Sequence, residues 1–235
     1  MKKRSFTFFL LSLIAGCDNK NNVKQFEAAY QATLNADDPF QALDLFEMQS
    51  GGYGRNCDSA RAFLFSIWYA PSKDCEARDN AMQEIILKAI EKGSMRALIF
   101  LFDPSQKLPG VYPENLNNDV TTKLAERLVK LAEKAPAGRK NTLLLMRAGD
   151  VLQSGKYVLQ DSRKAADLHV RAWLAGDSYA ASKLVGVYSY LKDYRRAYFW
   201  EIRSRNLKYD FRSELSSDEI IEIQQLASDS SRSNL

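Results

Sequence analysis

Histidine and cysteine are scarce in this chain, which limits the chemistry that it can carry. There is one histidine, His169, and there are three cysteines, at positions 17, 57 and 75, in 235 residues. A histidine-based metal site needs a second histidine, and a cysteine zinc site needs a CxxC spacing that the sequence lacks. A nucleophile triad lacks its parts as well. We therefore expect no metal, no cofactor and no catalytic residue, and we interpret His169 as a satisfied or solvent-facing residue of a helix.

Other enzyme signatures are also missing. The cluster Gly51-Gly52-Tyr53-Gly54 has neither the following lysine nor the preceding strand of a phosphate-binding loop. Carboxylate pairs such as Asp74 with Glu76 begin predicted helices, where acidic side chains favour the helix dipole and need no catalytic role. We expect that the protein is not an enzyme. A cell-wall carbohydrate-acting enzyme stays as a remote alternative, because two facing carboxylates need meet only in space.

The N-terminal apolar run is too short to cross a membrane. Basic residues at positions 2–4 precede a mostly apolar stretch over 6–15, which has ten residues, whereas a bilayer span needs ~20. Small residues follow it before Cys17. This order of basic, apolar and small residues is typical of a secretory leader. An ordinary signal peptide with an incidental cysteine and an uncleaved anchor are the alternatives.

The run ends in Ile14-Ala15-Gly16-Cys17, which resembles the bacterial lipobox. The resemblance implies that a signal peptide over 1–16 is removed and that Cys17 is lipidated, with palmitate among its acyl chains. It also implies a tether over 17–22 and a lipid anchor in the bacterial cell envelope that faces the periplasm. Several acyl chains on one residue make such attachment stable. Asp18 and Asn19 resemble the signal that retains lipoproteins in the inner membrane. They slightly favour the inner membrane as the location.

Little net charge remains once the leader is removed. The full chain has a formal net charge of +4, but residues 1–16 contain three basic residues and no acid, so the remainder has +1. The basicity therefore belongs to the leader. A nucleic-acid-binding protein needs a basic surface, so we expect no nucleic-acid partner.

If Cys17 is lipidated, its thiol cannot pair, and an even pair of cysteines is left in an oxidising compartment. We predict a disulfide between Cys57 and Cys75. The alternative is two unpaired buried thiols, because spacing alone does not decide between them.

Strand patterns are absent, and the apolar spacing is helical nearly everywhere. Val23, Phe26, Tyr30 and Leu34 lie on one helix face, and Asp38-Pro39-Phe40-Gln41 predicts the start of a second helix. Further helices are predicted over 58–69, 76–91, 94–101, 120–134, 141–153, 162–175, 178–191 and 194–205. A capping box of Ser216 and Glu219 predicts a last helix. We expect a break and hinge over 103–119, which contains three prolines, and a disordered tail over 229–235.

Two segments share one pattern. Ala89, Gly93, Ala97 and Leu101 lie four residues apart, and the same residue types recur at the same spacing at positions 172, 176, 180 and 184. A glycine ending one helix in a left-handed turn, with alanines on both sides, lets two backbones approach closely.

The second copy extends both ways and resembles the Sel-one-like repeat, a relative of the tetratricopeptide repeat. The residues that carry the resemblance are Gly149, Gly155, Asp161, Lys164, Ala165, Ala172, Gly176, Ala180, Leu184, Gly186, Tyr188, Asp193, Arg196, Ala197 and Trp200. The resemblance implies an all-α fold, an α-solenoid of stacked antiparallel helix pairs, over 23–228. It is clearest over 75–102 and 141–228. Such arrays serve many functions, so the fold alone does not identify one.

We expect the chain to bind another protein, a toxin or an envelope component. Tyr190, Tyr194 and Arg195 are the partner-binding candidates, because tyrosine and arginine are enriched in binding hot spots and these three lie outside the repeat consensus. Small lipidated proteins with these repeats resemble immunity proteins that neutralise periplasm-acting toxins, including type VI secretion phospholipases. An adaptor or scaffold for envelope assembly, signalling, or a secretion or conjugation machine is the alternative.

Overall fold

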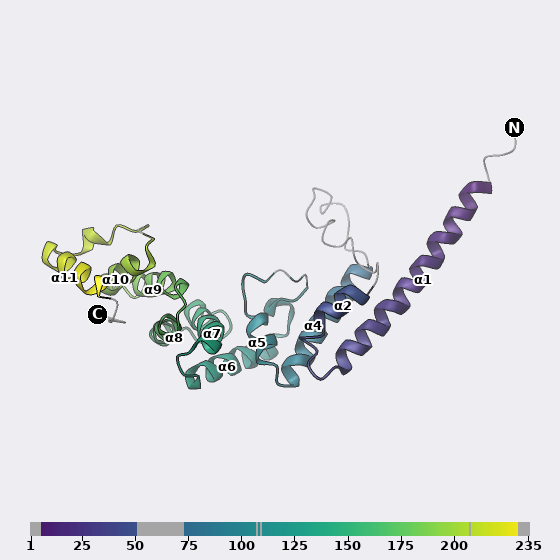
Figure 1. Cartoon of the computed structure of the whole chain (residues 1–235), viewed down its shortest axis with the longest axis horizontal. Helices are drawn as coiled ribbons and strands as arrows, with labels where there is room; N and C mark the ends of the chain where they lie inside the picture. Colours follow the sequence, from purple (N-terminus) through teal and green to yellow (C-terminus); the bar gives the residue numbers. More distant parts are fainter. Residues whose placement is uncertain (1–5, 51–72, 107, 109, 207, 230–235) are drawn as a thin grey trace. The chain divides into compact units, whose positions relative to one another are not determined.

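The helical spacing of the sequence is matched by the structure, a computed structural model that describes residues 6–50, 73–106, 108, 110–206 and 208–229, with side chains from residue 20 onward. All regular secondary structure in these ranges is helical (Figure 1), which confirms the all-α prediction. The predicted helices from 76–91 onward lie within three residues of the observed boundaries. The helix predicted over 58–69 and most of the predicted tail lie outside the described residues.

The chain divides into two compact units, Met1–Asn115 and Leu116–Leu235. The division falls inside the segment 103–119, where the prolines predicted a break. Within this segment, side chains satisfy backbone groups: Asn115 donates to the carbonyl oxygen of Gly110 at 2.8 Å, and Gln106 donates to that of Val111. Val111 is fully buried. The described residues from Gln106 to Asn115, which belong to unit 1, are therefore held by their own hydrogen bonds although they contain little regular helix.

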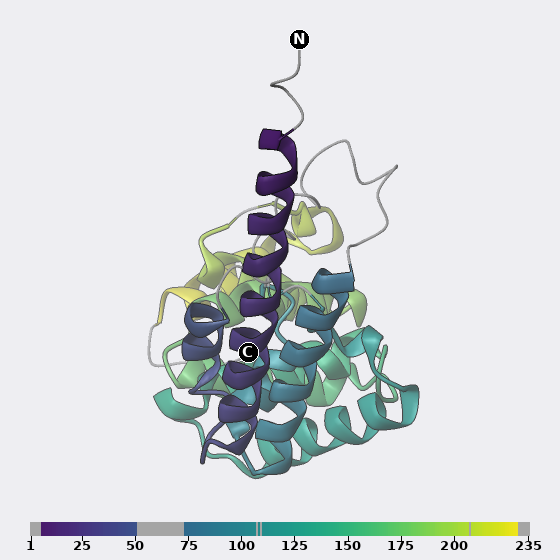
Figure 2. The ribbon, with the colours of Figure 1, turned by 90° about the vertical axis from the view of Figure 1, so that its right-hand side faces the viewer.

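Unit 1 is built from four described helices. They are α1 (Phe6–Asn35), α2 (Leu43–Gln49), α4 (Lys73–Glu91) and α5 (Met95–Leu101), followed by the short η2 (Pro113–Asn115). Helix α1 packs against α2 and α4, and α4 packs against α5 (Figure 2). The ring centroids of Phe26 and Phe46 lie 5.6 Å apart between α1 and α2, and Met82 is fully buried in α4. The apolar face predicted for the first helix therefore supports this core.

The predicted start of the second helix at Asp38 is wrong. The Asp38 carboxylate accepts a hydrogen bond from the backbone N–H of Phe40 at 3.0 Å, two residues along, and helix α2 begins only at Leu43. An N-cap aspartate and an Asx turn can both make this bond, and the Asp38 carbonyl oxygen also accepts from the backbone N–H of Ala42 at 3.2 Å. This single turn does not continue as regular helix, which begins five residues later. The side chain that was expected to begin the helix therefore forms a turn before it.

Unit 2 is a succession of helices that each pack on the next. They are α6 (Asn118–Lys134), η3 (Arg139–Asn141), α7 (Thr142–Ser154), α8 (Ser162–Leu174), α9 (Tyr179–Tyr190), α10 (Tyr194–Ser204), η4 (Phe211–Glu214) and α11 (Ser217–Ser228). Buried aromatic residues of α10, among them Phe199 and Trp200, form a large part of the core. The capping box of Ser216 and Glu219 begins α11 as predicted.

The two matching sequence segments adopt the same turn. Gly93 and Gly176 both have φ of +97°, and the residue after each donates to the carbonyl oxygen five positions earlier, at 2.9 Å and 3.1 Å. This is the Schellman arrangement at a helix C-terminus, which favours glycine. The alanines around each glycine, at positions 89, 97, 172 and 180, are fully buried. The turn predicted from the four-residue spacing is confirmed at both places.

Two aspartates begin helices in the same way. Asp161 accepts from the backbone N–H of Lys164 at 3.0 Å, and Asp193 accepts from that of Arg196 at 3.1 Å. A third Schellman turn precedes Asp193, and here the left-handed position is Lys192, with φ of +56°. A non-glycine residue in this conformation is strained by ~1–2 kcal/mol.

Candidate partner-binding surface

The three cysteines fall in unit 1. Cys17 lies within α1, and its side chain and the whole of Cys57 lie outside the described residues. Cys75 is in the first turn of α4 and takes part in a disulfide. Lipidation of Cys17 and pairing between Cys57 and Cys75 stay predictions. None of the helices within the described part of the chain has the length and apolar character of a bilayer span.

His169 lies in helix α8 as predicted, and at 1% exposure it is buried and not solvent-facing. Among the described residues its Nδ1 atom has no hydrogen-bond partner, so the ring is not fully satisfied either. The ring fits against α7 because position 149 is glycine: a Cβ there would lie 2.6 Å from the ring carbon Cε1. Burial lowers the pKa of His169 to about 4, although the nearby Asp150 opposes the shift. The imidazole is therefore neutral at physiological pH.

Asp150 connects α7 with its neighbours. Its carboxylate pairs with Lys183 of α9 at 2.8 Å and with Arg147 of α7 at 3.4 Å. The closest approach to the His169 ring is 3.8 Å, between Oδ1 and Nε2, which is too long for a hydrogen bond. No set of three or more metal-ligating side chains lies together among the residues that the structure describes. The Asp150 contacts are those of a structural polar cluster between helices.

Tyr194 and Arg195 lie at the start of α10 and make contacts within the chain. The Arg195 guanidinium pairs with Glu219 at 2.9 Å and with Glu222 at 2.7 Å, both on α11, and these carboxylates raise its pKa. The Tyr194 ring lies 6.3 Å from that of Phe211. Arg195 therefore helps to hold α11 on α10, and Tyr194 contacts η4.

Tyr190, at the end of α9, is the candidate that stays available. Its side chain is 60% exposed, and its hydroxyl is 3.1 Å from Oε1 of Gln160 in the loop between α7 and α8. Gln160 also donates to the backbone oxygen of Gln153 at 2.8 Å. Gly155, with φ of +64°, begins the loop. These contacts fix the loop against α9.

Leu159, next to Gln160, is 92% exposed, and sequence reasoning missed it. The exposed apolar side chains on this loop and the end of α9 form what we term the loop patch, which consists of Leu159, Tyr190 and Leu191. The signal that could have found Leu159 was its place in a loop of seven residues, where the corresponding α9–α10 connection has three. A contiguous exposed apolar patch marks an interaction site, whereas a single exposed apolar side chain is ordinary, so the loop patch is of interest as a group.

Comparison with known proteins found no match from which a function could be inferred. No family model matches the chain, and neither a curated protein nor a solved structure matches it. The function is therefore inferred from the chain's own residues.

Proposed function

We propose that this protein is a lipid-anchored, periplasm-facing module of the bacterial envelope that binds another protein through its loop patch. Tyr190 and Leu159 carry the proposal. They are 60% and 92% exposed, and the Tyr190 hydroxyl donates to Gln160, the neighbour of Leu159, whose amide in turn donates within the loop. Exposed aromatic and aliphatic side chains on a preorganised surface lose little conformational entropy on binding.

The module is a stacked array of antiparallel helix pairs of the Sel-one-like kind. Three observations support this part of the proposal: the matching Schellman turns at Gly93 and Gly176, the matching N-caps at Asp161 and Asp193, and the packing of each helix of unit 2 on the next. A helical pair that cannot bury its apolar face alone must stack on neighbours. Such a scaffold holds its loops in fixed places.

The specific role that we propose is immunity against a toxin that acts in the periplasm, such as a type VI secretion phospholipase. An inhibitor of this kind needs a rigid surface, tight binding and the same compartment as its target. The lipobox supports the compartment, and the loop patch supplies a surface of suitable chemistry. Hydrophobic anchors that fill pockets on a partner contribute most of the affinity in such complexes.

Co-expression with the product of the neighbouring gene, sent to the periplasm, tests the proposal. The wild-type chain should prevent lysis, and Leu159→Asp combined with Tyr190→Ala should abolish protection. Tyr179→Ala is the matched control, because Tyr179 is also 60% exposed and lies at the other end of the same helix.

Each outcome has a separate meaning. Lysis that the wild-type chain does not change would refute the immunity role. Protection that survives the double variant would refute the loop patch while leaving immunity in place. An envelope adaptor would instead be retained on membrane machinery through the same patch.

A further inference from the structure

The end of α6 and the turn into α7 are strongly basic. Between positions 127 and 149 the sequence contains six basic residues and a single acid, Glu133. The Glu133 carboxylate is already paired with Lys164 of α8 at 2.9 Å. Positive charge therefore exceeds negative charge over this stretch, although Arg147 pairs with Asp150 just beyond it.

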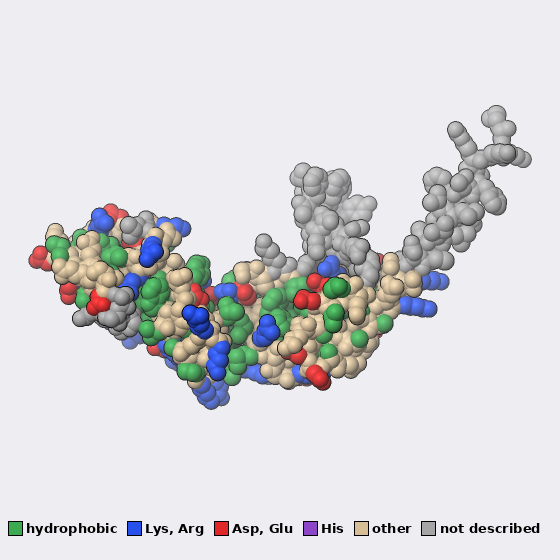
Figure 3. Space-filling view, in the orientation of Figure 1, with side chains coloured by type: hydrophobic (Ala, Val, Ile, Leu, Met, Phe, Trp, Pro, Cys, Tyr) green, Lys and Arg blue, Asp and Glu red, His purple; other side chains and the backbone are tan. Residues whose placement is uncertain are grey.

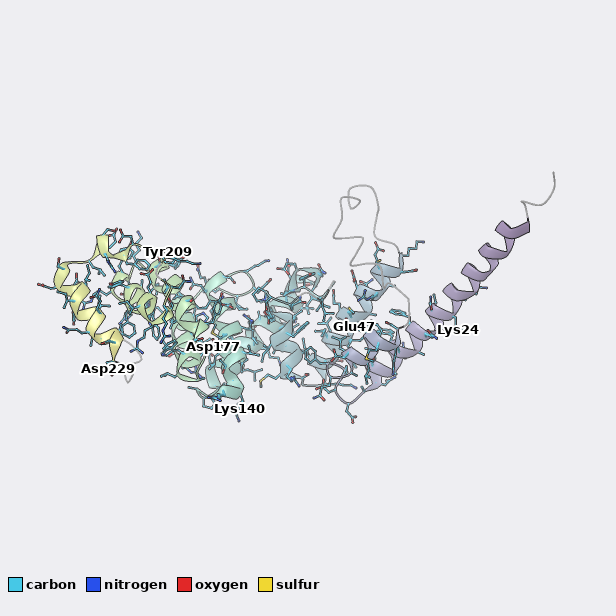
Figure 4. The ribbon with its side chains drawn as sticks, turned by 45° about the horizontal axis from the view of Figure 1, so that its top comes forward. Lys24, Glu47, Lys140, Asp177, Tyr209 and Asp229 are labelled. Atoms are coloured by element: carbon cyan, nitrogen blue, oxygen red, sulfur yellow. The ribbon has the colours of Figure 1, made fainter. Side chains whose placement is uncertain are left out.

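Five of the six basic residues are exposed, and a leucine is exposed among them. We term Lys130, Lys134, Arg139, Lys140 and Leu143 the basic turn; all five side chains are exposed, Leu143 by 58%. Among the residues that the structure describes, no ion pair includes any of the four cations. Lys and Arg side chains gather on this part of the surface (Figure 3), and Lys140 points away from the ribbon (Figure 4).

The backbone beneath these side chains is held in place. Asn141 donates from Nδ2 to the carbonyl oxygen of Pro136 at 2.9 Å and from its backbone N–H to that of Gly138 at 2.8 Å. The Arg171 guanidinium, from α8, donates to the carbonyl oxygens of Ala132, at 3.0 Å, and Ala135 at the end of α6. The basic turn thus presents its cations from a backbone that is already ordered, so binding does not need to order the backbone.

We propose that the basic turn rests on the anionic headgroups of a phospholipid membrane. Long basic side chains beside an exposed leucine suit the lipid interface, because the cations meet phosphates while the leucine enters the acyl boundary. Each cation near an anionic membrane strengthens binding roughly five-fold, which is about 1 kcal/mol. A protein partner would be expected to use the larger aromatic content of the loop patch instead.

The two surfaces lie at opposite ends of one helix. The basic turn lies at the start of α7 and Leu159 of the loop patch lies in the loop after its end, and α7 has 13 residues, which corresponds to a length of ~20 Å. With the basic turn on lipid, the loop patch points away from the membrane toward a partner. The inference does not depend on the immunity proposal, because membrane binding is measured with lipid alone.

Tryptophan reporters at the two ends of α7 provide the test. The full chain carries Cys17→Ser, so that it cannot be acylated, and either Leu143→Trp or Leu159→Trp; the chain without either reporter gives the background. The vesicles contain equal parts of phosphatidylcholine and brominated phosphatidylglycerol, whose bromine quenches tryptophan. We expect strong quenching for Leu143→Trp and none for Leu159→Trp. Quenching of both, of neither, or of Leu159→Trp alone overturns the proposal.

Charge variants separate this surface from the basic leader, which every variant contains. Neutralising the basic turn with Lys130→Gln, Lys134→Gln, Arg139→Gln and Lys140→Gln should weaken vesicle binding at least roughly ten-fold, since each close cation contributes about five-fold. The control neutralises four other exposed cations of unit 2, with Arg163→Gln, Lys192→Gln, Lys208→Gln and Arg212→Gln.

The control variant should bind like the wild type. Equal losses in both variants would show that only net charge matters and would overturn the proposal. So would retention on double-stranded DNA as tight as on the vesicles, because the surface would then be a general polyanion site.

Discussion

The buried imidazole of His169 makes the stability of unit 2 depend on pH. Burial lowers the pKa of this group from 6.5 to about 4, so the unfolded chain takes up the proton more readily than the folded one. Stability is therefore complete above pH ~6.5 and falls as the pH drops toward 4. The shift corresponds to a loss of about 3 kcal/mol in the free energy of unfolding at pH 4, and about 2 kcal/mol at pH 5.

His169→Gln removes the titration and keeps a polar side chain at the site. The measurement is urea unfolding of wild type and variant from pH 7 to pH 4, followed by the fluorescence of Trp173 and Trp200, which lie in unit 2 on α8 and α10. Other groups titrate alike in both chains, so the difference between the two unfolding free energies isolates the histidine. We expect the variant to lose less stability than the wild type as the pH falls.

Parallel curves for the two chains would refute this reasoning. They would mean that His169 takes up its proton as easily in the folded chain as in the unfolded one. The ring would then be hydrated and not packed against Gly149, where a Cβ would come within 2.6 Å of it. A difference of the opposite sign would indicate that Asp150, rather than burial, controls the histidine.

Four further substitutions have expected outcomes. Arg171→Ala removes the donor to the last carbonyl groups of α6 and should cost about 1–3 kcal/mol in thermal unfolding; an unchanged Tm would contradict that capping role. Lys192→Gly should stabilise unit 2 by up to about 1 kcal/mol, and Gly176→Ala should destabilise it by a similar amount, because both positions have positive φ; equal signs in chemical denaturation would be inconsistent with this. Cys75→Ser should lower the free energy of unfolding by about 2–4 kcal/mol by removing a disulfide. Non-reducing peptide mass mapping of the wild type should find Cys57 as the partner, and free alkylation of both cysteines would contradict this.

Local chemistry made the helices predictable. The glycines at 93 and 176 and the capping box of Ser216 and Glu219 act through neighbours a few residues away, and the structure has them as predicted. The predicted helix start at Asp38 was wrong because a short acidic side chain can make either an N-cap or an Asx turn. The choice depends on packing that the local sequence does not contain.

The candidate site was less predictable because its contacts are distant in sequence. Arg195 pairs with carboxylates more than twenty positions away on α11, and His169 is buried by a glycine on another helix. Neither contact leaves a periodic signal. Tyr190 was found by its residue type, whereas Leu159 was missed because a single loop leucine has no pattern around it.

The connection between α7 and α8 can change in length at a small cost in free energy. It has seven residues where the α9–α10 connection has three, and doubling the length of a loop costs only about 0.6 kcal/mol in closure entropy. The alanines between the helices are fully buried, so larger residues there would force the backbones apart. Diversification among descendants should therefore proceed by insertion and substitution in this loop, with the helix interfaces held under purifying selection.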